Sequence, residues 1–279
     1  MHIATVGDVM LDVVVDVPEG LRADDDTPAT IELSGGGQAA NVATWAVALG
    51  ASATLIGPRG TSTVEALIAG RLTAAGVSYA GISTEGPGAV VVSILTAGTR
   101  TLATDAGDQS WLSRVTPALL PADVDWLHVS SYPLLRTADA SPVVSMVEHA
   151  RRHASRVSVD LSSSALLETY GAEAFRSLLD RIAPDVVFAN LAEWSTLAPS
   201  SAERWSDVVV KEGAAGATVL SNGVATTYPA PGVAVTDSTG AGDAFAAGYL
   251  VGGVELALRA AARCLTQLGA QPDAGAPAR

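Results

Sequence analysis

The chain has 279 residues but only one cysteine, one lysine and few aromatic side chains. A single cysteine, Cys264, excludes an internal disulfide and any metal site built from several cysteines, and we interpret it as a small buried apolar residue. Lysine and arginine together number 16 against 29 acidic residues, which gives a formal net charge of −13. Without clustered positive charge the chain is a poor candidate for binding nucleic acid, although a local site can still bind an anion.

Long apolar runs and a basic N-terminal segment are also lacking. No apolar run reaches the roughly 18 residues that cross a membrane, and the first residues lack the positive charge of a signal peptide. We therefore expect a cytoplasmic protein without a membrane partner. Apolar residues, in contrast, make up 48% of the chain, which is enough for a large core.

Strand-like and helix-like segments alternate along most of the chain. The strand-like segments are rich in β-branched residues, and the helix-like segments between them are about 10–15 residues long. The expected strands are residues 2–9, 52–56, 125–130, 156–161, 185–190, 208–211 and 218–221, and the expected helices are residues 39–49, 63–75, 140–154, 172–182, 240–251 and 255–268. This alternation predicts an α/β fold with a mainly parallel sheet covered on both faces.

Two hairpin-like stretches, residues 13–33 and 88–105, do not follow that alternation. We expect them to form a small accessory sheet, inserted into a single domain that spans residues 1–279. Residues 272–279 are predicted to be a loose tail.

The sharpest motif is the string DSTGAGDAF at residues 237–245. Glycines before an apolar helix let backbone N–H groups and the helix N-terminus form a cradle for an anion. One interpretation makes Asp243 a helix cap, but a cap alone does not require Asp237, Thr239 and two glycines beside it. A carboxylate at an anion cradle suits a base that deprotonates a hydroxyl attacking phosphorus.

A second glycine-rich string, GGGQAAN, occupies residues 35–41. These glycines serve either a tight strand-to-helix turn alone or a floor on which a polar substrate approaches the backbone. In the second interpretation, Asn41 offers both a donor and an acceptor to neighbouring hydroxyls.

Together the two strings resemble the ribokinase-like (PfkB) family of sugar kinases. That family pairs a Gly-Gly-x-x-x-Asn motif with a later Asp-Thr/Ser-x-Gly-Ala-Gly-Asp motif, which correspond here to residues 36–41 and 237–243. Further matches are GDVMLD at residues 7–12, NLAE at 190–193 and KEGAAGA at 211–217, so the resemblance extends over nearly the whole chain. It implies a three-layer α/β/α fold with a small β lid, and transfer of the γ-phosphoryl group from ATP to a sugar hydroxyl with Mg²⁺.

Roles for individual residues follow from the same resemblance. Asp243 would be the general base, and the anion hole would consist of Gly240, Ala241 and Gly242.

Substrate contacts are likewise implied by position. The sugar would be bound by Asp12, Gly36, Gly37 and Asn41, beneath a lid that the two inserts form to exclude water. Arg100, at the turn of the second insert, is either a contact for an anionic substrate or a solvated hairpin residue.

Nucleotide and ion contacts complete the set. Asn190 and Glu193 would organise Mg²⁺ through water, because Mg²⁺ dehydrates reluctantly, and Asp237 would help to bind a monovalent cation, which is K⁺ in some relatives. Lys211, where many relatives have threonine, either reaches a nucleotide phosphate or is a solvated strand-end lysine. The segment assigned to the nucleotide contains Lys211, Gly213 and Gly216.

Three features have no settled role. Asp160 lies at a strand end, where α/β folds place ligand groups, but it also suits a cap on the next helix. His149 and His153 have i, i+4 spacing, which fits a solvated helix face better than a metal site. Residues 61–63 stand where relatives commonly carry acidic residues, so the substrate contacts of that loop are open.

Alternative functions are a nucleoside kinase of the same family and a catalytically idle member that binds a sugar as a sensor. The base and the anion loop argue against a sensor. The sequence has no Gly-x-Gly-x-x-Gly after its first strand and no Gly-Lys-Ser/Thr string, which argues against a dinucleotide-binding oxidoreductase and a Walker-type P-loop. Many relatives dimerise through their lids, and the apolar pattern here leaves a homodimer through the lid open.

Overall fold

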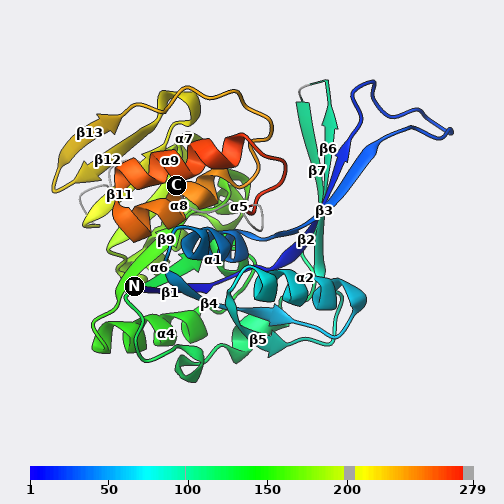
Figure 1. The fold of residues 1–279 in the computed structure, drawn as a ribbon. Helices are drawn as coiled ribbons and strands as arrows, with labels where there is room; N and C mark the ends of the chain where they lie inside the picture. Colours follow the sequence, from blue (N-terminus) through cyan, green and yellow to red (C-terminus); the bar gives the residue numbers. More distant parts are fainter. Residues whose placement is uncertain (98, 198–204, 273–279) are drawn as a thin grey trace.

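The computed structural model of the chain describes residues 1–97, 99–197 and 205–272, without the side chain of Arg100. Its larger sheet has nine strands in the order β13-β12-β11-β10-β9-β8-β1-β4-β5 (Figure 1). The β11–β12 and β12–β13 pairs are antiparallel, and the other pairs are parallel. The strands are β1 His2–Val6, β4 Ser52–Arg59, β5 Ser78–Ser83, β8 Trp126–Ser130, β9 Arg156–Asp160, β10 Val186–Asn190, β11 Asp207–Lys211, β12 Ala217–Ser221 and β13 Val224–Tyr228.

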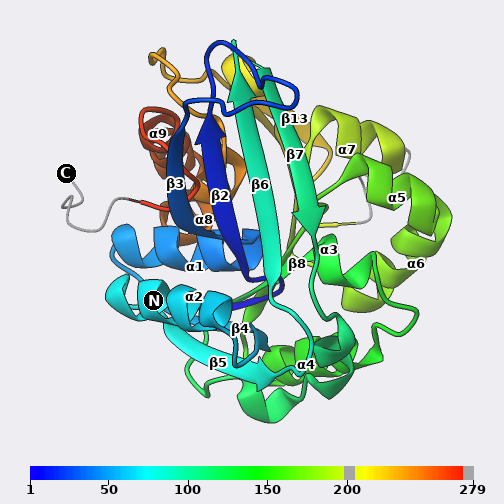
Figure 2. The ribbon, with the colours of Figure 1, turned by 90° about the vertical axis from the view of Figure 1, so that its right-hand side faces the viewer.

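Helices cover both faces of this sheet (Figures 1 and 2). One face packs against α1 Gln38–Ala48, α2 Thr63–Ala74, α8 Ala241–Gly252 and α9 Val254–Leu265. The other packs against α3 Ser131–Leu134, α4 Ser141–Arg152, α5 Ser164–Tyr170, α6 Ala172–Ile182 and α7 Leu191–Leu197. Short 3₁₀ turns are η1 Ser110–Arg114, η2 Pro117–Leu119 and η4 Gly213–Ala215. The three layers confirm the α/β/α fold class expected from the sequence.

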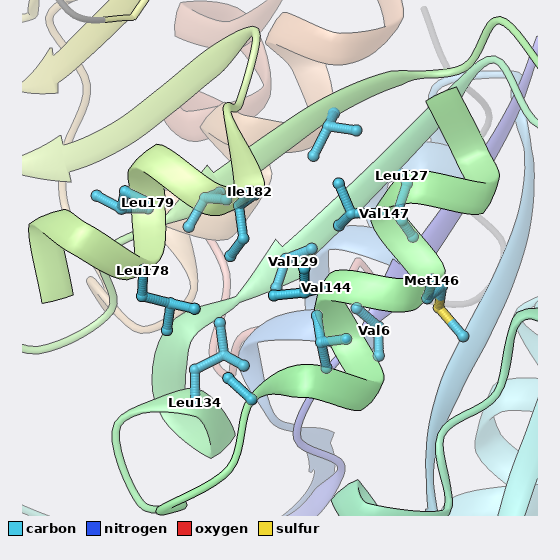
Figure 3. Packing of buried hydrophobic residues seen from close by; sticks show 14 of the residues in the cluster. Val6, Leu127, Val129, Leu134, Val144, Met146, Val147, Leu178, Leu179 and Ile182 are labelled. Atoms are coloured by element: carbon cyan, nitrogen blue, oxygen red, sulfur yellow. The ribbon is translucent and has the colours of Figure 1, made fainter. Parts of the chain in front are cut away.

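Each face of the sheet has its own hydrophobic core. Figure 3 shows one of them, in which Val6 and Val129 of the sheet lie near Val144 and Val147 of α4. The buried residues of α6 are Phe175, Leu178, Leu179 and Ile182, and this i, i+3, i+4, i+7 spacing puts them on one stripe of the helix. Each such side chain contributes about 1.5–3 kcal/mol when it is fully buried, so the helices hold the strand ends in fixed positions.

A smaller sheet projects from the body beside α1 and α2 (Figure 1). Its strand order is β3-β2-β6-β7, with β2 and β6 parallel and the outer pairs antiparallel. The strands come from the two stretches that interrupt the α/β alternation. They are β2 Met10–Asp16, β3 Thr30–Gly36, β6 Ala89–Thr96 and β7 Thr99–Asp105.

Two strands of the larger sheet, β5 and β13, are not predicted by the sequence pattern. Both are edge strands, and β13 is exposed along nearly its whole length. An exposed edge strand has no buried face to impose apolar alternation. Among the described residues, no helix combines the length and the apolar character needed to cross a membrane.

Candidate active site

Polar side chains gather where neighbouring parallel strands end. Ser130 ends β8 and pairs with Asp160 at the end of β9, while Asn190 ends β10 and pairs with Lys211 at the end of β11. Ligands of open α/β sheets bind at this edge. A cavity of about 790 Å³ opens here, lined also by the start of α8 and by strands of the smaller sheet.

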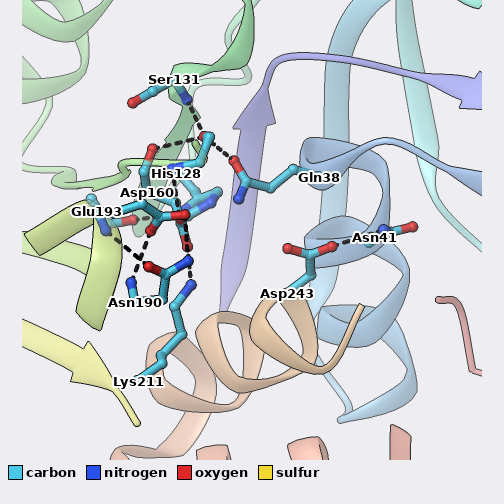
Figure 4. A network of polar contacts seen from close by, with 11 residues as sticks. Gln38, Asn41, His128, Ser131, Asp160, Asn190, Glu193, Lys211 and Asp243 are labelled. Carbon is cyan, nitrogen blue, oxygen red and sulfur yellow. Dashed lines mark hydrogen bonds and ion pairs between the residues drawn. The ribbon is translucent and has the colours of Figure 1, made fainter. Parts of the chain in front are cut away.

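Asp243 lies in the first turn of α8, but it is not the helix cap. The N-cap is Gly240, with a φ of 74°, and no side chain caps the helix. Oδ2 of Asp243 instead accepts a hydrogen bond of 2.8 Å from Nδ2 of Asn41 (Figure 4). The two glycine-rich strings, far apart in sequence, therefore meet at this carboxylate.

The environment of Asp243 moves its ionisation close to neutral pH. Burial raises the pKa of the carboxyl to about 7, against the lowering effect of the Asn41 hydrogen bond. The negative charge of Asp160 raises the pKa further, and the positive charge of Lys211 lowers it. A carboxyl group with this pKa can accept a proton near pH 7.

Asp237 is buried behind the glycine loop and organises it. Its Oδ1 accepts hydrogen bonds from the backbone N–H and the hydroxyl of Thr239, at 2.9 and 2.6 Å. Its Oδ2 accepts a 3.0 Å hydrogen bond from the backbone N–H of Gly269. The loop before α8 is thereby tied to the segment that follows α9.

That segment, residues 266–272, also reaches α1. The indole Nε1 of Trp45 donates to the carbonyl of Ala270 at 2.9 Å, and Nε2 of Gln271 lies 3.3 Å from Oδ1 of Asn41. A Cβ on Gly240 would lie 2.6 Å from the same Ala270 carbonyl oxygen, so this position requires glycine for space as well as for its positive φ. Ala270 and Gln271 therefore pack directly behind the pair formed by Asp243 and Asn41.

Asn190 and Glu193 bind each other reciprocally (Figure 4). The backbone N–H and the amide of Asn190 donate to the two oxygens of Glu193 at 2.8 and 2.7 Å, and the Glu193 N–H donates back at 2.9 Å. Burial and the neighbouring Asp160 raise the pKa of Glu193. The carboxyl group is thus fixed in place at the wall of the cavity.

Lys211 forms an ion pair of 2.6 Å with Asp160. Burial alone would lower the pKa of Lys211, but Asp160, Glu193 and Asp243 outweigh it and raise that pKa, so the ammonium stays charged. Lys211 is therefore not a solvated strand-end lysine. Asp160 is not a helix cap either, because Ser163 caps α5.

Further polar residues line the cavity near the smaller sheet. Asp8 accepts hydrogen bonds from the Ser130 hydroxyl at 2.8 Å and from the backbone N–H of Gln38 at 3.0 Å. The amide oxygen of Gln38 accepts from Ser162, whose φ of 69° is unusual for a residue with a side chain. Asp12 lies against Gly36, because a Cβ there would come within 2.0 Å of its Oδ1.

Most of the residues predicted from the motifs line this cavity and form part of its wall. They are Asp12, Gly37, Asn41, Asn190, Glu193, Lys211, Gly213, Gly216, Gly240, Ala241, Gly242 and Asp243. Gly36 and Asp237 lie directly behind that wall. Arg100 pairs with Leu95 in the hairpin of β6 and β7, and its side chain lies outside the described part of the chain.

Several lining residues carry no motif signal. Tyr132, Arg136 and Ser162 all line the cavity and all follow a strand end. Their position after a parallel strand was the available signal, and it is shared by many residues that bind nothing. In the described part of the chain, no group of three histidine, cysteine or acidic side chains is arranged to hold a metal ion.

Cys264 is buried, as expected. Burial raises the pKa of its thiol to about 12, and its sulfur contacts the carbonyl of Thr239 at 3.2 Å. The thiol therefore supports the loop before α8 as a neutral, packed group.

The protein thus combines a three-layer α/β/α fold with a cavity in which a glycine-rich loop precedes α8 and the Asp243 carboxylate lies beside that loop. The family model for pfkB family carbohydrate kinases matches residues 1–271. An ATP-dependent ribose-1-phosphate kinase of Halopiger xanaduensis is 30% identical over 280 residues, covering 95% of this chain and 90% of the relative. The chain therefore belongs to the pfkB family of carbohydrate kinases, and it is an ATP-dependent phosphotransferase.

Solved structures agree on the fold. The adenosine kinase of Sinorhizobium meliloti superposes with a TM-score of 0.82 at 21% identity, covering 97% of this chain and 95% of that one. A putative ribokinase II of E. coli, in complex with ATP and Mg²⁺, gives a TM-score of 0.79 at 19% identity, covering 96% and 94%. These identities are low, so the two structures support the architecture alone.

Proposed function

We propose that Asp243 is the general base that lets this kinase phosphorylate a sugar hydroxyl. The observation that carries the proposal is a half-buried carboxylate in the first turn of α8, oriented by Asn41 and with a pKa near neutrality. Asp243 takes the hydroxyl proton, the hydroxyl oxygen forms a bond to the γ-phosphorus, and the bond from that phosphorus to ADP breaks.

The anion hole is assigned to the backbone N–H groups at the start of α8, from Gly240 to Gly242. These groups and the helix dipole favour negative charge at this point. Lys211 adds a positive charge beside them, because a Cβ on Gly242 would lie 3.3 Å from its ammonium nitrogen. The nucleotide would extend from here past Gly213 and Gly216, which line the same cavity.

Mg²⁺ fits the donors on this wall. Glu193 and Asn190 offer oxygen atoms but no complete cage, which suits an ion that keeps water and phosphate ligands. We assign its protein contacts to these two residues through water, where the ion neutralises phosphate charge. We assign a K⁺ contact to Asp237, supported by its buried negative charge beside the anion loop.

The acceptor is assigned to the other end of the cavity, next to Asp12, Gly37 and Asn41. The smaller sheet, whose strands line this end, would act as the lid that excludes water. Ribose 1-phosphate is a candidate acceptor because the curated relative acts on it. Nucleosides are a second candidate class because the adenosine kinase shares the fold.

The test is an ADP-release assay over pentoses, hexoses, sugar acids, sugar phosphates and nucleosides, with Mg²⁺ and with K⁺ or Na⁺. Asp243→Asn should lower turnover by about 10³-fold while ATP binding and the circular dichroism spectrum stay unchanged. Glu148→Gln, on the exposed side of α4, is the control. Near-normal turnover of Asp243→Asn would refute the base, and equal rates in K⁺ and Na⁺ would refute the K⁺ site alone.

We also propose that the enzyme works in the cytoplasm, where ATP is available, without nucleic acid or membrane as a partner. Its net charge of −13 supports the absence of a nucleic-acid partner. A homodimer through the lid is supported by exposed apolar side chains on one outer strand of the smaller sheet, Ile31 and Leu33 of β3.

A further inference from the structure

Arg136 is a cavity-lining cation that no role above uses. It follows α3, just beyond the end of β8, and it is half-buried. Its guanidinium lies 5.4 Å from the centre of the Tyr132 ring, and both residues line the cavity. Stacking on an aromatic ring holds the planar guanidinium in one orientation.

The surroundings of Arg136 differ from those of the other cation in the cavity. Lys211 is paired with Asp160 at 2.6 Å. Arg136 has neither an ion pair nor a side-chain hydrogen bond with any residue that the structure describes, so the five N–H donors of its guanidinium are unused within that part of the chain. A half-buried cation of this kind is available to an anion from outside the protein.

The position of Arg136 assigns that anion to the acceptor and not to ATP. Arg136 lies one short helix beyond Ser130, the last residue of β8, which donates to Asp8, and Asp8 also accepts a hydrogen bond from the backbone N–H of Gln38 at the start of α1. Tyr132 is half-buried, and its hydroxyl has a raised pKa because of that burial and then of the charges of Asp8, Asp243, Glu193 and Asp160, with Asp8 the largest of these charges. Arg136 therefore belongs to the substrate end of the cavity, across from the nucleotide segment.

We propose that the acceptor is an anionic sugar and that Arg136 binds its anionic group, a phosphate monoester or a carboxylate. The proposal rests on the kinase function proposed above and narrows its substrate class. Five carboxylates line the cavity: Asp8, Asp12, Asp160, Glu193 and Asp243. These carboxylates can bind the hydroxyls of a neutral sugar without a guanidinium, but they repel an anionic sugar, which therefore requires a cation. The two N–H groups of an arginine fork match two oxygens of one anionic group.

The experiment compares kcat and KM for ribose, ribose 1-phosphate and a sugar acid in the wild type and in Arg136→Met and Arg136→Lys. Arg136→Met should raise KM for the anionic acceptor by about 10–100-fold, with kcat and the KM for ATP nearly unchanged. Arg136→Lys should recover only part of the loss, because a lysine lacks the fork. The ratio of rates on ribose 1-phosphate and the sugar acid identifies which anionic group is bound.

The matched control is Arg152→Met, on the exposed end of α4. Circular dichroism and the melting temperature of each variant show whether it folds. If Arg136→Met does not fold, Arg136→Lys takes its place as the test variant. A wild type that prefers neutral sugars, or a loss of equal size on ribose and ribose 1-phosphate, would overturn the proposal. Arg136-dependent binding of ribose 1-phosphate without ADP release from any acceptor would overturn the kinase mechanism and leave the anion site standing.

Discussion

At the scale of single residues, Asp243 combines two demands that oppose each other. As the proposed base it has to reach a phosphoryl group that is shielded from water, yet burial raises the pKa of its carboxyl to about 7. Asn41 donates a hydrogen bond that opposes this rise, and Lys211 opposes it through its charge. The amide and the ammonium thus keep a buried acid usable as a base near neutral pH.

The pH dependence of the reaction follows from this balance. Because the base acts in its ionised form, we expect kcat/KM to rise with pH through an apparent pKa of about 7. Removing the Asn41 donor with Asn41→Ala should move that limb to higher pH, since the hydrogen bond lowers the pKa of Asp243. Rates measured from about pH 5 to about pH 9 test both statements, and a flat profile for the wild type would contradict them.

At the scale of secondary-structure elements, the end of β3 determines the position of the Asp12 carboxylate, which we propose as a substrate contact. The pairing of β2 with β3 aligns Met10 with Gly36, which brings the Asp12 carboxylate onto the glycine face. The local backbone at Gly36 is extended, so the constraint on this position is space and not backbone conformation. A side chain there has to displace Asp12.

Gly36→Ala therefore tests whether Asp12 binds the acceptor. The added Cβ would lie 2.0 Å from Oδ1 of Asp12, so the carboxylate has to move. We expect KM for the acceptor to rise by about 10–100-fold, since a shift of about 1 Å can cost that much, while KM for ATP stays constant. Gly70→Ala, in α2 with open space around its Cβ, is the control. A KM that does not change would remove Asp12 from the site.

The elements that the sequence predicts are those with a buried face. The strands β1, β8, β9 and β10 are apolar because helices cover them, and α6 has the bounds expected from its apolar stripe. The helices α5 and α7, with seven residues each, depend on packing more than on local propensity, so no pattern marks them.

The same contrast applies to the site. Asp243, Asn41 and the glycine strings belong to motifs, so the motif resemblance alone predicts that they share one site. Arg136 and Ser162 lie in loops after strands, and only the order of the parallel strands makes them neighbours of the cavity. Their chemistry depends on sheet topology, which the local sequence does not encode.

At the scale of the whole molecule, the chain consists of a large α/β/α body and a thin sheet that stands out from it (Figure 1). The outer strand β3 of this sheet exposes apolar side chains on one face: Ile31 and Leu33 are 62% and 44% exposed. An apolar surface of this kind is covered when two copies pair through it.

We expect a homodimer in solution, measured by light scattering coupled to size-exclusion chromatography. Ile31→Asp should shift the protein to a monomer, because a carboxylate in an apolar interface loses its hydration without gaining a partner. Val224→Asp, on the exposed β13 of the body, is the control. A wild type that is monomeric at micromolar concentration would contradict the dimer.

The contacts of Ala270 and Gln271 with Trp45 and Asn41 have a consequence for biosynthesis. The ribosome synthesises the chain from the N-terminus onward, so α1 and both sheets emerge before Asp243, Ala270 and Gln271. Asp243 meets Asn41 only after α8 has emerged, and Ala270 and Gln271, which lie behind that pair, emerge after every helix and strand that the structure describes. A nascent chain in which both sheets have emerged therefore still lacks these contacts, and we expect it to be inactive as a kinase.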